Sequence, residues 1–164
     1  MLSGARLALL VGAVLLPATA AVAHAAGVAH EPPAEATRTV LAQAVDPAGS
    51  RGRTLALSRV TIPAHTRLGL HRHPGSQIAY IQSGTLTYTV RKGVVNVYRG
   101  AGDLEPTVVR RVAAGRTGTV RAGEWVIEGP RVVHFGANEG DRPVLILLAT
   151  LFRNGAPASV PMPG

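Results

Sequence analysis

Three histidines and one glutamine are the residues of this chain whose types and spacing best suit metal binding. His71 and His73 stand two residues apart, and residues two apart in an extended segment point to the same side. Gln77 follows the Pro74-Gly75 turn and begins the next extended run, so its side chain can fold back toward the same point. His134 comes from a separate run much later in the chain. Three neutral imidazoles and one amide oxygen therefore predict a site for one divalent metal ion, with positions left open for water or a substrate.

The chain has no cysteine, which excludes a thiolate metal site, a disulfide framework and a cysteine nucleophile. Imidazole ligands suit iron, manganese, nickel, copper or zinc, and ligand spacing does not choose among them. We therefore expect a divalent ion of this group as the cofactor.

Short runs of β-branched and apolar residues, separated by glycine and proline, make up most of the chain after residue 51. The runs that predict strands are Thr54–Ile62, Gln77–Gln82, Thr85–Val90, Val94–Arg99, Thr107–Val112, Thr117–Arg121, Trp125–Glu128, Val132–Ala137 and Val144–Phe152. No segment after residue 25 carries a sustained helical period. This pattern predicts an all-β fold, a sandwich or a jelly-roll barrel with little helix, whose interior can house a small ligand. The last run is continuously apolar, and we expect it to be buried on both faces.

The first 25 residues have the pattern of a secretion signal. A short positively charged start is followed by the apolar run Leu7–Leu16, which is too short to span a bilayer. Ala23-His24-Ala25 then supplies the small residues typical of a cleavage site, with cleavage expected after Ala25 or, alternatively, after Ala23. We expect a secreted, extracytoplasmic protein; an uncleaved anchor is the alternative.

Composition divides the rest of the chain into three parts. Residues 26–50 lack a clear period and predict a flexible lead-in with one short strand around Arg38–Ala44. Residues 51–153 hold the predicted strands and form the expected barrel domain. Residues 154–164 are rich in proline, alanine and glycine and predict a loose tail.

The first histidine-containing stretch resembles the first sequence motif of the cupin superfamily. His71-x-His73, three residues, Gln77, six residues and Gly84 follow the spacing of that motif, which has a glutamate where this chain has Gln77. The exchange removes one negative charge from the expected ligand set. It should weaken metal affinity, sharpen Lewis acidity and favour an anionic substrate or hydroxide at the open position.

A later stretch resembles the second cupin motif. Gly123, ten residues, His134, three residues and Asn138 follow its spacing, although Gly129-Pro130-Arg131 replaces the family's Pro-x-Gly. The resemblance implies a small conical double-stranded β-helix, often dimeric, with the metal inside the barrel. We accordingly expect His71, His73, Gln77 and His134 as the metal ligands and a homodimer as the assembly.

Each residue of the expected site also has a simpler interpretation. His71 and His73 can be ordinary polar residues at a barrel mouth, and His134 can be a core histidine whose hydrogen bonds are satisfied. Gln77 can hydrogen-bond a neighbouring water instead of binding the ion, because amides are poor metal ligands. His65 follows Pro63 in a turn, and we expect it at the surface.

The resemblance permits several functions. One hypothesis is a metal-dependent dioxygenase, lyase or isomerase acting on a small oxygenated or anionic molecule. Glu124, Glu128, Tyr80 and Tyr88 are the candidates for a general base, but none has a spacing that requires this role, and the tyrosines and Trp125 equally suit the core. The alternatives are a binding module without catalysis and a structural dimer that uses Val144–Phe152 as its interface.

The formal net charge is +8, carried almost entirely by arginine. The arginines are scattered along the chain and the aromatic residues are sparse, so we expect a solvated basic surface and no nucleic-acid partner. No stretch after the signal is long enough to span a membrane convincingly. The expected partner is therefore a small-molecule ligand or substrate.

Overall fold

The computed structural model describes residues 35–100 and 105–164, so the expected signal peptide lies outside the described residues. Within these two ranges every regular element is a strand, and no helix is present that could cross a membrane. The strands are β1 (Thr37–Val45), β2 (Arg53–Ile62), β3 (Thr66–Arg67), β4 (His71–Arg72), β5 (Ser76–Ser83), β6 (Thr85–Lys92), β7 (Val94–Arg99), β8 (Thr107–Ala113), β9 (Arg116–Arg121), β10 (Glu124–Glu128), β11 (Val133–Asn138), β12 (Val144–Arg153) and β13 (Val160–Pro161).

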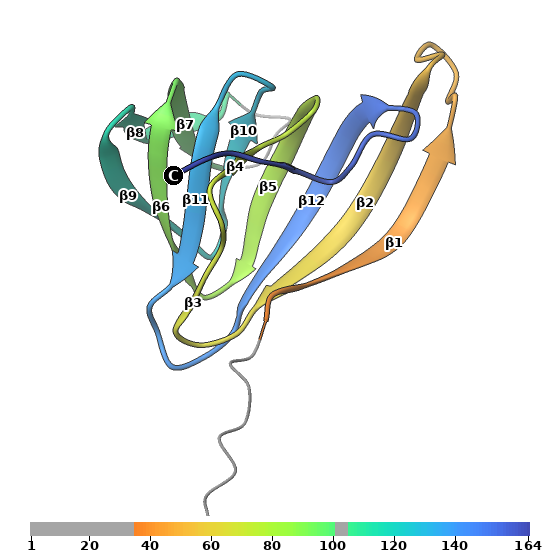
Figure 1. Ribbon diagram of the computed structural model, residues 1–164. Helices are drawn as coiled ribbons and strands as arrows, with labels where there is room; N and C mark the ends of the chain where they lie inside the picture. The colour runs from red at the N-terminus through yellow and green to blue at the C-terminus, as the bar shows by residue number, and fades with distance from the viewer. Residues whose placement is uncertain (1–34, 101–104) are drawn as a thin grey trace, which may run out of the picture. The chain divides into compact units, whose positions relative to one another are not determined.

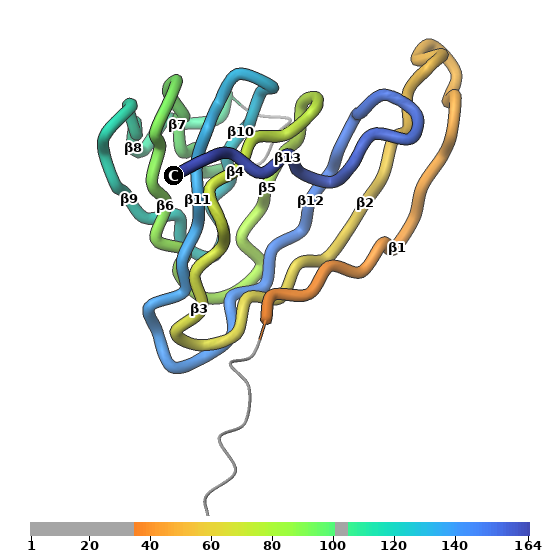
Figure 2. The backbone as a smooth tube through the Cα atoms, viewed as in Figure 1, coloured from red at the N-terminus to blue at the C-terminus, as the bar shows by residue number. Residues whose placement is uncertain are grey.

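Two antiparallel sheets contain these strands (Figure 1). The first sheet has seven strands in the order β1-β2-β12-β5-β10-β7-β8. The second has the order β13-β4-β11-β6-β9, with β3 also paired to β11. Strands far apart in sequence are therefore neighbours, as when β12 lies between β2 and β5. The tube in Figure 2 shows the same arrangement, with the blue C-terminal segment running from β12 across to the strands of the second sheet.

The two-residue alternation of the strands explains where the core lies. In β5, Ala79 and Ile81 are buried, whereas Ile78 and Tyr80, which alternate with them, are exposed on the outer face. The inward residues of both sheets form one apolar cluster that includes Ile62, Leu86, Val97, Val126 and Ile146. Burying each such side chain contributes roughly 1.5–3 kcal/mol, so the cluster holds the two sheets together.

Gly84 forms the turn by which the chain passes from β5 of the first sheet to β6 of the second. Its φ is +85°, a conformation that L side chains rarely adopt. A Cβ at this position would also lie 2.9 Å from Cγ2 of Val144. Ser83-Gly84 is thus a turn between the two sheets and not a hairpin, and the register of β5 is set by its pairing with β10 and β12.

The strand expected around Arg38–Ala44 is present as β1, which pairs with β2 from Thr37 to Val45 and is an edge of the first sheet. Two other segments differ from the sequence-based expectations. The run Val144–Phe152 is not buried on both faces, because the outer side chains of its second half, such as Leu151, are exposed. The tail is tied down as well, since Val160 and Pro161 form β13 against β4.

Candidate metal centre

Three histidines meet on the inner side of the second sheet. His71 lies in β4 directly opposite His134 of β11, and His73 follows at the end of β4. One ring nitrogen from each of the three lies within 4.8 Å of the other two. The prediction that these three side chains lie close together is therefore confirmed. The pairing of β4 with β11 brings them together.

Backbone carbonyls fix the orientation of two of the imidazoles. His71 Nδ1 lies 2.7 Å from the Gly69 carbonyl oxygen, and His73 Nδ1 lies 2.9 Å from that of Ala158. A carbonyl can only accept, so each Nδ1 carries the proton and donates it, and the lone pair of each neutral ring is on Nε2. Metal-binding histidines in proteins are oriented in the same way, by a hydrogen bond from the nitrogen that does not bind the ion.

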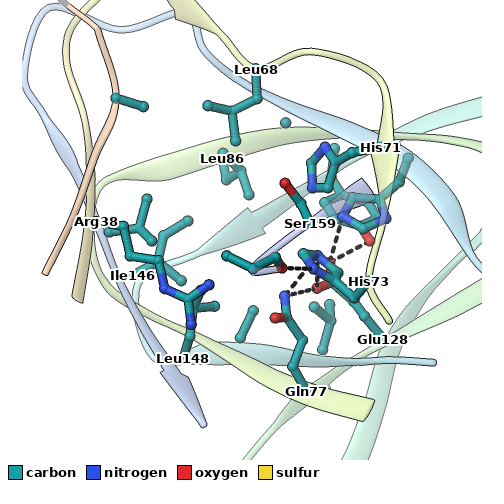
Figure 3. A pocket seen from close by; sticks show the side chains of 18 of the residues that line it. Arg38, Leu68, His71, His73, Gln77, Leu86, Glu128, Ile146, Leu148 and Ser159 are labelled. Carbon is teal, nitrogen blue, oxygen red and sulfur yellow. Dashed lines mark hydrogen bonds and ion pairs between the residues drawn. The ribbon is translucent and has the colours of Figure 1, made fainter. Parts of the chain in front are cut away.

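Glu128, which spacing singled out only as one of several general-base candidates, lies among the histidines (Figure 3). Its Oε1 is 3.1 Å from Nε2 of His134, and its Oε2 is 3.4 Å from Nε2 of His73. Tyr88 donates its hydroxyl hydrogen to Oε1 at 2.6 Å. The carboxylate is buried. Glu128 is the last residue of β10, and the pairing of β10 with β5 places it directly opposite Gln77.

Gln77 presents its amide nitrogen to the centre. Nε2 donates to Glu128 Oε2 at 2.5 Å and lies 2.9 Å from the acceptor Nε2 of His73. Its Oε1 is buried and has no hydrogen-bond partner among the described residues. In this arrangement the side chain links Glu128 to His73 as a donor, and an amide nitrogen is not a metal ligand.

The fold matches solved structures of one class. A cupin 2 domain-containing protein from Halorhodospira halophila is 13% identical to this chain and superposes with a TM-score of 0.51. The match covers 84% of this chain and 77% of that protein. The chain has the cupin fold. A cupin superfamily protein from Desulfitobacterium hafniense is 12% identical over 72% of this chain and 78% of its own, with a TM-score of 0.47. An oxalate decarboxylase from Lactobacillus farciminis is 20% identical over 66% of this chain but only 26% of that enzyme, with a TM-score of 0.42.

No family model matches the sequence, and no curated protein sequence matches it. The match to the Halorhodospira halophila structure shows the fold alone, because its sequence identity is low, and the chemistry has to be argued from the residues inside the barrel.

Burial and neighbouring charges set the ionisation of the centre. Burial lowers the pKa of His134 to about 4, although the Glu128 carboxylate acts in the opposite direction. Burial also lowers the pKa of His71. Burial alone would raise the pKa of Glu128, but His134, His73 and the Tyr88 hydroxyl outweigh it and hold the pKa well below its usual range. Burial therefore favours neutral imidazoles at His71 and His134, while the neighbours of Glu128 favour its ionised carboxylate.

These residues fit a divalent ion. Two ligands that each bind one ion at about 2.0–2.2 Å lie roughly 3 Å from each other. The contacts of Glu128 with His134 and His73, at 3.1 and 3.4 Å, are in this range. The hydrogen bonds from Nδ1 of His71 and His73 to backbone carbonyls leave Nε2 of each ring as the nitrogen that would bind the ion.

An apolar cavity of about 460 Å³ opens from the metal centre into the barrel. The histidines, Gln77, Tyr88 and Glu128 form one part of its wall, and most of the remainder is aliphatic. Arg38 of β1 lines the same cavity, as do Ala158 and Ser159 of the tail. The expected lead-in strand and the tail that was expected to be loose thus both contribute to the cavity.

The other candidates are distributed as follows. Tyr88 is buried as expected for a core residue, yet its hydroxyl reaches Glu128. Tyr80 lies exposed on the outer face of β5. His65 is at the surface, as expected, and pairs with Asp141 at 3.1 Å. Asn138 does more than terminate a strand, because its buried amide contacts the carbonyls of Ile62, Pro63 and Arg142.

Proposed function

We propose that this protein binds one divalent metal ion inside its cupin barrel and acts on a small oxygenated or anionic molecule in the adjoining cavity. The observation that carries the proposal is the convergence of His71, His73 and His134, whose ring nitrogens lie within 4.8 Å of one another. Iron, manganese, nickel, copper and zinc all accept imidazole ligands in such a site. When bound, the ion would polarise a substrate oxygen or activate water or dioxygen.

The residues around the ion would perform the remaining tasks. Gly69 and Ala158 hold the imidazoles through backbone carbonyls, and the aliphatic wall excludes bulk water from the centre. Glu128 keeps a buried negative charge beside the ion, which favours its retention. The Tyr88 hydroxyl donates to this carboxylate and so helps to hold it in place.

A non-catalytic binding module is the second candidate. The apolar cavity is large enough to enclose a small ligand whether or not a reaction follows. A panel of dioxygenase, lyase and isomerase substrates separates the two functions, since a binding module retains metal and ligand without turnover.

Two further features belong to the same proposal. The apolar run and the cleavage pattern within residues 1–25 support export of the protein, followed by removal of this segment. The exposed aliphatic residues on the outer face of the first sheet, including Leu57 and Ile78, support assembly into a homodimer.

Metal analysis of the purified protein tests the proposal. We expect close to one divalent ion per chain in the wild type and a strong loss in His71→Ala and His134→Ala. His65→Ala is the matched control, because His65 is an exposed histidine paired to Asp141, and it should retain the ion. Less than about 0.1 ion per chain in the wild type, unchanged when Mn²⁺, Fe²⁺ or Zn²⁺ is supplied, would contradict the proposal.

A further inference from the structure

We propose that Glu128, and not Gln77, provides the oxygen ligand that completes the three-histidine centre. This inference rests on the proposed metal-binding function and concerns which strand supplies the carboxylate. The sequence motif resembles one with a glutamate at position 77 of β5, and this chain has an amide there. The neighbouring strand β10 supplies a carboxylate at the directly opposite position, since Glu128 is the cross-strand partner of Gln77.

Geometry favours the carboxylate over the amide as the ligand. Both oxygens of Glu128 lie against imidazole Nε2 atoms, at 3.1 Å from His134 and 3.4 Å from His73. Gln77 has its nitrogen toward the centre and donates to Glu128 at 2.5 Å. Turning this amide over would place its oxygen against the Glu128 carboxylate, two acceptors facing each other. Gln77 is therefore a positioning residue that holds Glu128 toward the imidazoles.

The charge of the centre follows from this assignment. Three neutral imidazoles and an amide would leave a divalent ion without a compensating charge inside an apolar barrel. With Glu128 as a ligand, the centre keeps the one negative charge that position 77 has lost. The exchange at position 77 thus leaves the net charge of the ligand set unchanged.

Titration with Co²⁺ tests the assignment, because its visible spectrum reports the ligands and its affinity can be measured by calorimetry. We expect Glu128→Gln to weaken Co²⁺ binding by about tenfold or more and to change the spectrum. Gln77→Leu should weaken binding less. Glu139→Gln, at an exposed position, is the control and should behave as the wild type.

The exchanged double variant, Gln77→Glu with Glu128→Gln, gives the sharpest result. Because the two positions face each other across β5 and β10, moving the carboxylate back should restore Co²⁺ affinity to within a few-fold of the wild type. Wild-type affinity and spectrum in Glu128→Gln would overturn the assignment, as would a larger loss in Gln77→Leu than in Glu128→Gln. Either result leaves the three-histidine function standing, whereas a wild type that binds no Co²⁺ overturns both.

A separate observation indicates the chemical class of the ligand. Arg38 of β1 points into the cavity from one side, while the imidazoles of His71 and His73 lie across from it (Figure 3). Its Nη2 donates to Ser58 at 3.1 Å, and its Nε is buried with no hydrogen-bond partner among the described residues. Ile146 and Leu148 line the cavity near this guanidinium.

We infer that Arg38 binds the carboxylate of a ligand whose apolar body fills the cavity. A guanidinium has donors arranged in a fork that matches a carboxylate, and an unpartnered buried donor is a position where a ligand oxygen restores a lost hydrogen bond. Among the described residues that line this cavity, Arg38 is the only arginine or lysine, so it is the position that suits an anionic group. The ligand class is a small amphipathic carboxylic acid.

Binding of octanoate and octan-1-ol, measured by calorimetry, distinguishes the carboxylate from the apolar chain. We expect the wild type to bind octanoate at least about tenfold more tightly than octan-1-ol, and Arg38→Met to remove this preference. Arg59→Met, an exposed arginine on the outer face of β2, loses the same charge and should retain the preference. The same ratios are expected with and without Co²⁺, since Arg38 does not act through the ion. Unchanged octanoate binding in Arg38→Met, or no octanoate binding by the wild type, would overturn this inference.

Discussion

Glu124 and Glu128 lie on the same inner face of β10, but the side chains around them differ in charge. Glu124 accepts from Arg99 at 2.6 Å, from Arg110, and from the backbone N–H of Arg121 at 2.9 Å. Glu128 has imidazoles, an amide and a phenol around it and no arginine. Strand alternation turns both carboxylates inward, and their neighbours give Glu124 a structural role. Glu124 is therefore not the general base that the sequence left open.

Replacing Glu124 by glutamine should destabilise the barrel. Glu124 is fully buried, so its removal leaves Arg110 and Arg99 without their partner, although Arg99 is 59% exposed and retains hydration. We expect a loss of about 2 kcal/mol in the free energy of unfolding at pH 7, less than for a fully enclosed pair. Urea unfolding followed by circular dichroism measures it.

We expect the difference in the free energy of unfolding between the wild type and Glu124→Gln to depend on pH. Burial raises the pKa of Glu124, but the Arg121 N–H and the two guanidiniums outweigh it and lower the pKa below its ordinary value of 4.5. A carboxyl whose pKa is lowered in the folded state stabilises the fold above 4.5, and this contribution disappears as the pH falls through the lowered pKa. The difference between wild type and Glu124→Gln should therefore be full at pH 7 and shrink below pH 4.5. A difference that stays constant down to pH 3 would assign the loss to packing.

At the scale of elements, residues 154–164 form a C-terminal strap, a segment that connects the first sheet to the second. It leaves β12 in the first sheet and reaches β4 in the second, where Val160 and Pro161 pair with Arg72 and His71. On the way, Ala158 accepts from Nδ1 of His73. The strap thus orients a histidine of the centre through a single backbone carbonyl.

Deleting residues 154–164 should weaken metal binding while the barrel stays folded. The deletion removes the acceptor of His73 Nδ1, and loss of such a partner typically lowers metal affinity by about 10–100-fold. Co²⁺ titration measures the affinity, and circular dichroism checks the strand content. Deleting only Pro163 and Gly164, which follow β13, is the control and should leave the affinity unchanged. Equal affinities in the two truncated forms would show that the strap does not orient His73.

The elements also show how far the sequence could predict this structure. Period and turn residues locate β2 and the strands from β5 to β12 well, and Val94–Arg99 has the predicted bounds, but the two-residue strands β3 and β4 were not predicted. The sequence also brings His71, His73 and His134 together. The position of Glu128 depends on β10 pairing with β5, a long-range register that local spacing does not contain. The strap was missed because two residues of β13 leave no periodic signal.

At the scale of the whole barrel, the outer face of the first sheet carries an apolar row across four strands. Leu57 of β2 faces Ala149 of β12, which faces Ile78 of β5, which faces Ile127 of β10. Leu57, Ile78 and Ile127 are each more than 40% exposed. Exposed apolar patches of this kind commonly mark interfaces. Since both edges of β12 are paired, a partner would cover this face and not add a strand to Val144–Arg153.

The proposed homodimer predicts a concentration-dependent change of mass. Sedimentation velocity should show a dimer in the wild type and a monomer in Leu57→Lys with Ile78→Lys, because two charges in the row would be buried without partners. Val40→Lys with Val108→Lys makes the same chemical change at exposed positions outside this row and should leave the dimer intact. A wild type that sediments as a monomer at all concentrations would exclude the dimer.

The register that sets Glu128 opposite Gln77 has a consequence for how such barrels are found and how they diverge. Two facing positions on adjacent strands can exchange one carboxylate through two substitutions, and an intermediate with a carboxylate at both positions never loses the charge. A search pattern that demands glutamate at the first position would discard a chain after such an exchange. A search for three imidazoles and a carboxylate in space, indifferent to which strand supplies the acid, would keep it.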